Sequence, residues 1–116
     1  MSAQVYTLCF LLYSATGMGG LFLLLLAQRW LPGGPGDGYL VTPMTADLAA
    51  NTAISFSTTT TWQAYGGETT LRYQTQLLGL VSQHFLQGAA GMAVGIAFIR
   101  GFARERSATV GNFWVD

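Results

Sequence analysis

The sequence predicts an all-α integral membrane protein in which two transmembrane helices flank a short re-entrant helix and its loop. Three observations predict this class. The chain of 116 residues is 51% hydrophobic and 9% charged, against about 25% charged residues in soluble domains. Two long runs carry no charge, and a short helix-like segment ending in consecutive threonines lies between them.

Charge and cysteine content exclude several classes of function. The five basic residues are all arginines and balance five acidic residues, so the formal net charge is zero. Such a balance offers no field that would attract nucleic acid. The single cysteine, Cys9, excludes an internal disulfide and a cysteine-built metal site. No nucleotide-binding loop, phosphorylatable motif or catalytic pair is visible, so we expect a protein that is not an enzyme and has no catalytic residue.

The first transmembrane helix is expected at about residues 5–30. No residue from Val5 to Ala27 is charged, and this run exceeds the roughly 20 residues that cross a hydrocarbon core of about 30 Å. This run is also longer than the apolar core of a cleaved signal peptide, and no positive charge precedes it as one would in such a peptide. The polar and aromatic residues 28–30 suit the membrane surface. Proline and glycine then predict a loop over Pro32–Gly38.

The re-entrant segment is expected at about residues 43–63. Thr42 can cap a helix that has Pro43 at its first position and Asp47 near its start. A helix over Pro43–Ser57 would extend only about 20 Å, too short to cross. The threonines Thr58 to Thr61 follow it. Such backbone at membrane depth must be buried in protein or line a wet cavity, where its oxygens can replace the hydration shell of a cation. Composition alone leaves a water-exposed loop or strand equally open.

The second transmembrane helix is expected at about residues 69–100. Glu68 opens it, and no residue from Tyr73 to Ile99 is charged if His84 is neutral. A cluster of arginines follows, so the positive-inside rule places this end, with the tail 101–116, in the cytoplasm. The arginines are Arg100, Arg104 and Arg106. Two crossings return the chain to its starting side. Both termini are therefore expected in the cytoplasm, and the threonine loop is expected on the extracytoplasmic side. Residues 1–116 would form a single unit of membrane helix, re-entrant loop and membrane helix.

The second predicted helix carries two further candidate features. Gly91 and Gly95 are four residues apart and would let another membrane helix approach closely, although small residues are also common in spanning helices. His84 and its neighbour Gln83 are polar residues inside the span. We expect His84 to have a hydrogen-bonded packing role. Haem ligation or proton relay are the alternatives.

Residues Asn51 to Gln63 read Asn-Thr-Ala-Ile-Ser-Phe-Ser-Thr-Thr-Thr-Thr-Trp-Gln. This stretch closely resembles the run Asn-Thr-Ala-x-Ser-Phe-x-Thr-Asn-Thr-Asn-Trp-Gln in the potassium-binding subunit of the Kdp-type potassium-transporting ATPase. The resemblance covers nearly the whole chain. Its other parts are Leu31-Pro32 with Pro35, Gly67-Glu68-Thr69-Thr70-Leu71, Gly111-Asn112 and Trp114-Val115-Asp116.

This resemblance implies a fold and a set of site residues. In that family, four potassium-channel-like repeats surround one selectivity filter. Each repeat consists of a membrane helix, a pore helix with its filter loop, and a second membrane helix. By position, Thr58, Thr59, Thr60 and Thr61 would bind potassium as one quarter of the filter. Gln63 would line its outer mouth, and Trp62 would wedge the loop in place. Thr59 and Thr61 stand where the family usually has asparagine.

The resemblance also implies the function and partners. The subunit binds extracytoplasmic potassium and passes it toward a P-type ATPase subunit, in an ATP-driven high-affinity uptake complex of the bacterial or archaeal cell (inner) membrane. Expected partners are the other Kdp subunits, the lipid bilayer and further repeats of the same subunit. Potassium is then the transported ion, and no tightly bound cofactor is expected. We expect the sequence to be part of a longer subunit.

Two alternatives stay open from the sequence. A one-repeat protein could assemble as a fourfold pore. A small two-helix accessory or assembly protein that binds no ion would have the same composition, with its threonine loop exposed to water.

Overall fold

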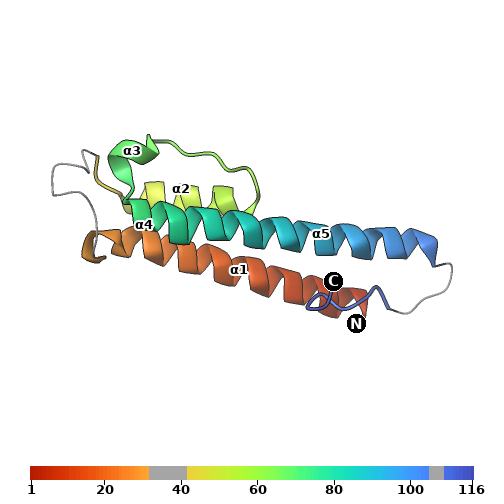
Figure 1. Cartoon of the computed structure of the whole chain (residues 1–116). Helices are drawn as coiled ribbons and strands as arrows, with labels where there is room; N and C mark the ends of the chain where they lie inside the picture. The colour runs from red at the N-terminus through yellow and green to blue at the C-terminus, as the bar shows by residue number, and fades with distance from the viewer. Residues whose placement is uncertain (32–41, 105–108) are drawn as a thin grey trace.

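The computed structural model describes residues 1–31, 42–104 and 109–116, and within these ranges it contains helices and connecting segments only. Helix α1 (Ala3–Ala27) continues into a short 3-10 turn, η1 (Gln28–Trp30). The second long helix consists of α4 (Tyr73–Thr75), a π-helical stretch η2 (Gln76–Val81) and α5 (Ser82–Ala103). It runs back beside α1 as an antiparallel hairpin (Figure 1).

Both long helices have the length and composition of membrane-spanning helices. The stretches are Ala3–Trp30 and Tyr73–Ala103, and only 11% and 17% of their most apolar windows are buried inside the chain. The central helix of a soluble protein would be mostly buried. Here large apolar side chains such as Leu12, Leu23, Phe85 and Met92 are exposed instead. That distribution suits helices surrounded by lipid or by other membrane helices.

The second long helix begins later than the sequence predicts. Glu68 lies in a separate short helix, α3 (Gly67–Thr70), and the backbone is extended at Leu71 and Arg72 before the long helix starts at Tyr73. The start expected near residue 69 is therefore wrong. The buried side chain of Gln28 explains the break, because its Nε2 donates to the carbonyl of Thr70 (3.0 Å) and its Oε1 accepts from the N–H of Arg72 (3.2 Å). The amide thus satisfies backbone groups that a continuous helix would pair internally.

Helix α2 (Ala46–Ser57) packs on α1 and on the start of the second long helix. The buried cluster between them comprises Leu21, Leu25, Ala49, Ala53, Phe56, Leu71 and Leu80. The predicted cap at Thr42 with Pro43 in the first turn is wrong, because Thr45 is the N-cap. Thr42 instead donates its N–H to the carbonyl of Thr69 (3.2 Å), and the carbonyl of Thr45 accepts the N–H of Ala49 (2.9 Å). The predicted loop over Pro32–Gly38, together with Arg106, lies outside the described residues.

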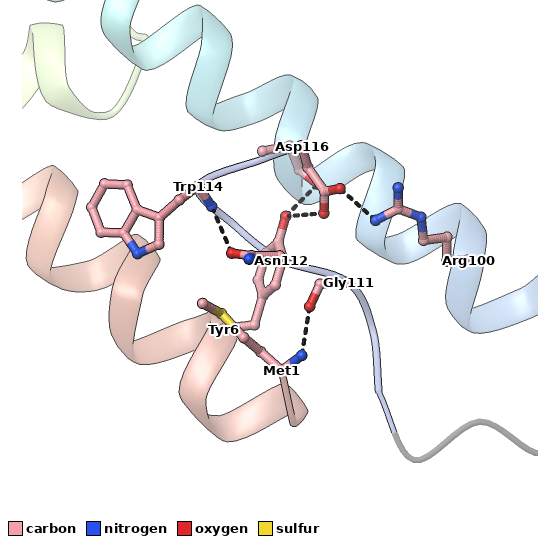
Figure 2. A network of polar contacts seen from close by, with 8 residues as sticks. Met1, Tyr6, Arg100, Gly111, Asn112, Trp114 and Asp116 are labelled. Carbon is pink, nitrogen blue, oxygen red and sulfur yellow. Dashed lines mark hydrogen bonds and ion pairs between the residues drawn. The ribbon is translucent and has the colours of Figure 1, made fainter.

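The segment 109–116 folds back against the N-terminal end of α1 (Figure 2). Phe113 is buried and makes edge-to-face contacts with Tyr6, Phe10 and Tyr13. The ammonium group of Met1 donates to the carbonyl of Gly111 at 2.7 Å. Both ends of the described chain therefore lie at one end of the hairpin, and α2 lies toward the other end (Figure 1).

An ion pair joins this segment to the end of α5. Arg100 Nη1 donates to Asp116 Oδ1 at 2.6 Å, and the side chain of Asp116 is only 5% exposed. The hydrogen bond from Arg100 is the main reason why the pKa of Asp116 lies below its ordinary value of 3.8. Because the folded-state pKa is lowered, the pair stabilises the fold fully above that ordinary value, and its contribution is lost as the pH falls through the folded-state pKa.

We therefore expect segment 109–116 to loosen in acid. Amide hydrogen exchange of the purified membrane protein should show strong protection of this segment at pH 7 and loss of protection below about pH 4. Asp116→Asn should be poorly protected at both pH values, because the amide cannot form the ion pair. Equal protection of the variant and the unmodified protein at pH 7 would show that the apolar contacts of Phe113 alone hold the segment.

Candidate filter at the carboxyl end of helix α2

The part of the threonine loop that follows Thr58 is held to α2 through Ser55. The N–H groups of Thr60 and Thr61 both donate to the backbone carbonyl of Ser55, at 3.0 and 3.2 Å. The N–H of Trp62 donates to the Ser55 hydroxyl at 2.6 Å. Three consecutive N–H groups of the loop therefore point toward the last turn of α2.

The backbone of the loop alternates in handedness. Thr58 has a φ of −99°, whereas Thr59 and Thr61 have positive φ values of 61° and 55°, the only positive values at non-glycine residues in the described ranges. Alternation of right- and left-handed residues aligns successive peptide dipoles, with the N–H groups on one side and the carbonyl oxygens on the other. The shared attachment of the N–H groups to Ser55 agrees with this arrangement.

The carbonyl oxygens of the loop are left available. Within residues 1–31, 42–104 and 109–116, no hydrogen bond is made to the carbonyls of Thr59, Thr60 or Thr61. The loop also follows directly on the carboxyl end of α2, where the helix dipole places partial negative charge. Neutral carbonyl and hydroxyl oxygens beside a helix carboxyl end form an environment that suits a cation with a readily shed hydration shell. A surface hollow lined by Asn51, Ile54, Ser55, Thr58, Thr60 and Trp62 lies against the same loop.

A second set of contacts fixes α2 to the hairpin behind the loop. Gln83, which is 4% exposed, donates from Nε2 to the hydroxyl of Ser57 at 3.2 Å. Gly17 of α1 makes room for this side chain, since a Cβ there would lie 2.7 Å from Gln83 Nε2. The last turn of α2 is therefore tied to both long helices.

The two residues after the threonines differ in their surroundings. The side chain of Trp62 is 57% exposed, and its backbone N–H is the group that ties it to α2. Its role as a wedge stays a prediction. Gln63 is half-buried and donates from Nε2 to the hydroxyl of Tyr65 at 3.3 Å.

The other predicted site residues lie away from the loop and face outward. Gly91 and Gly95 are exposed, and no atom lies within 4 Å of a Cβ placed on either. α1 therefore packs on another face of α5, the one with Ala90 and Ala93, and packing of the glycines on a further helix stays a prediction. His84 is exposed on α5, and its imidazole makes no hydrogen bond within the described part of the chain. The hydrogen-bonded packing role expected for it is not seen here.

Sequence reasoning assigned no role to Ser55 or Tyr65, nor to Thr52, whose hydroxyl contacts that of Tyr65 at 3.0 Å. All three lie within or just after the motif that runs from Asn51 to Gln63. The sequence gives only a weak signal for these roles. A serine in the last turn of a short helix and a tyrosine after a polar loop have many other uses.

The positive φ values predict that asparagine would suit positions 59 and 61 better than threonine. A β-branched residue in the left-handed region is a steric outlier, whereas asparagine visits that region readily. We expect Thr59→Asn to raise the stability of the loop by roughly 1 kcal/mol, seen as a higher thermal unfolding midpoint of the detergent-solubilised protein. Thr60→Asn is the matched control and should bring no gain, because Thr60 lacks a positive φ. An equal gain at both positions would contradict this explanation.

These features define the class of the protein. It is a helical membrane protein unit, with two long apolar helices and a short helix whose carboxyl end carries a loop rich in free oxygens. Comparison with known proteins is more specific. The family model described as KdpA, potassium-transporting ATPase A subunit, matches residues 1–116, and the chain belongs to this family.

Relatives in several bacteria share about half of their residues with this chain. The potassium-transporting ATPase potassium-binding subunit of Rhodospirillum centenum is 51% identical over 111 residues, which is 96% of this chain. Proteins of the same name are 50% identical in Burkholderia mallei, over 117 residues, and in Ralstonia pickettii, over 116 residues, each covering 100% of this chain. In each case the chain spans 19% of the relative's length.

Proposed function

We propose that this chain forms one repeat of the potassium-binding subunit of an ATP-driven potassium uptake complex, and that Thr58 to Thr61 form a quarter of its selectivity filter. The observation that carries the proposal is the two-sided loop. The N–H groups of Thr60, Thr61 and Trp62 are bound to Ser55 on one side. On the other side, the carbonyls of Thr59, Thr60 and Thr61 accept no hydrogen bond from the residues that the structure describes. A water-exposed loop needs no such arrangement, but a dehydrated cation needs several carbonyl oxygens that face the same way.

The fold supports a membrane-helix, pore-loop, membrane-helix arrangement. Helix α2 is too short to cross a bilayer, and it packs beside the two long helices rather than extending them (Figure 1). The two ends of the described chain meet at the opposite end of the hairpin, where Arg100 and Arg104 also lie. Together with the positive-inside rule, this arrangement supports a topology with both ends in the cytoplasm and the filter loop on the extracytoplasmic side.

The proposed unit is incomplete by itself. Free carbonyls at membrane depth need cover from protein or water, and the exposed faces of both long helices leave room for neighbours. Three further repeats of the longer subunit would complete the filter, and potassium would pass from it toward the P-type ATPase subunit, which would hydrolyse ATP. This unit would contribute ion ligands and no catalytic group.

Protection of the loop by potassium tests the proposal. The full-length subunit carrying this segment, assembled with its partner subunits, would be prepared with Cys9→Ser and single cysteines at positions 58 to 61. We expect a membrane-impermeant thiol reagent added from outside to label these cysteines slowly in potassium and faster when lithium replaces potassium, since lithium is too small to be coordinated by the same oxygens.

A cysteine at Thr69 is the matched control. Thr69 is exposed on α3, on the same side of the proposed membrane as the loop, and its labelling should not depend on the cation. Rapid labelling of all four loop positions regardless of potassium would overturn the filter assignment and would favour an accessory protein with a water-exposed loop.

A further inference from the structure

Three hydroxyl and amide groups form a hydrogen-bonded chain behind the proposed filter mouth. Gln63 Nε2 lies 3.3 Å from the hydroxyl of Tyr65, which lies 3.0 Å from the hydroxyl of Thr52. The Thr52 hydroxyl lies in turn 2.8 Å from the backbone carbonyl of Leu48 in α2. Thr52 is 1% exposed, so its contacts are shielded from water. The chain links the mouth residue to the helix that supports the filter.

The donors and acceptors of this chain converge on Tyr65. The Thr52 hydroxyl donates to the Tyr65 hydroxyl and also lies within reach of the Leu48 carbonyl. The NH₂ group of Gln63 donates to the same Tyr65 oxygen. A tyrosine oxygen can accept through its lone pairs, so Tyr65 binds the NH₂ end of the Gln63 amide while Thr52 holds the Tyr65 hydroxyl in place.

We propose that Tyr65 is a positioning residue that sets the orientation of the Gln63 amide. With its NH₂ group held by Tyr65, the amide oxygen is the free end of Gln63, and it has no partner in the described part of the chain. A free oxygen at the mouth attracts an arriving cation, whereas a free NH₂ group would repel it. This inference rests on the proposed function, because it assigns Tyr65 a task at the filter mouth.

The test uses the full-length subunit in its assembled complex, with potassium uptake measured over a range of potassium concentrations. Tyr65→Phe keeps the ring but removes the hydroxyl, so the amide loses its fixed orientation. We expect the KM for potassium to rise about two- to tenfold, the range that loss of one hydrogen bond produces, with the maximal rate nearly unchanged. Thr52→Val should act similarly, because valine cannot donate to Tyr65 and the tyrosine hydroxyl loses the contact that holds it in place. Thr52→Ser should preserve the KM.

Two further variants separate positioning from structural damage. Tyr73→Phe is the matched control, since Tyr73 is 67% exposed and its hydroxyl has no partner among the described residues, and it should leave the KM unchanged. Gln63→Ala should raise the KM by itself, and adding Tyr65→Phe to it should cause no further rise, because Tyr65 acts through Gln63.

The outcomes distinguish the two proposals. If Gln63→Ala raises the KM and Tyr65→Phe does not, the positioning role is wrong and the filter assignment survives. An additive effect in the double variant would also overturn the positioning role. If Gln63→Ala has no effect on the KM, the mouth assignment itself fails, and this inference fails with it.

Discussion

Gln63→Arg should raise the potassium concentration needed for half-maximal uptake by about 100-fold. The substitution places a permanent positive charge beside the proposed ion path. At a separation of about 6 Å and an effective dielectric constant of about 20, two unit charges repel by about 2.8 kcal/mol, which corresponds to about a 100-fold loss of affinity. The measurement is uptake by potassium-limited cells that express the complex with the full-length subunit.

The maximal rate should fall much less than the affinity, because saturating potassium would fill the proposed filter despite the repulsion. Gln4→Arg is the matched control. Gln4 is an exposed residue in the first turn of α1, at the end opposite to the threonine loop, and a positive charge suits the cytoplasmic side proposed for that end. Unchanged potassium affinity in Gln63→Arg would mean that residue 63 does not lie at the ion path.

Ser55→Ala should weaken potassium binding at least about fivefold and lower the preference for potassium over sodium. The substitution removes the hydroxyl that accepts the N–H of Trp62 at 2.6 Å in a partly buried hydrogen bond, and loss of such a bond costs about 1 kcal/mol or more. The backbone carbonyl of Ser55 would still hold Thr60 and Thr61. We therefore expect a loosened loop rather than an unfolded protein, and reduced selectivity is the sign of that loosening.

Rubidium and sodium competition during potassium uptake measures the effect of Ser55→Ala. Ser82→Ala is a suitable control, because Ser82 is an exposed serine of α5 whose hydroxyl has no hydrogen-bond partner in the described ranges. It should retain both affinity and selectivity. If Ser55→Ala retained both as well, the attachment of the loop to α2 would not determine the geometry of the ion site.

The sequence predicted the elements whose cause is local. Long uncharged runs indicate membrane helices directly, and both long helices are present. The threonine loop was recognised because consecutive threonines after a short helix are unusual and match a family motif. The structure places this loop at the carboxyl end of α2.

Features that depend on distant residues were not predicted. The break at Leu71 and Arg72 arises from the Gln28 side chain, more than forty positions away. The first turn of α2 starts late because Thr42 pairs with Thr69. The alternating handedness of Thr58 to Thr61 opposes the intrinsic preference of threonine, and only the bonds to Ser55 make it understandable. Local propensity could reveal none of these contacts.

The most direct test of the central claim is to locate the ion. Crystals of the assembled complex grown in rubidium would give an anomalous scattering peak at any site that binds this potassium substitute. We expect a peak in direct contact with the carbonyl oxygens of Thr59, Thr60 and Thr61. Rubidium peaks elsewhere in the complex, with none at these carbonyls, would contradict the assignment of this loop to the filter.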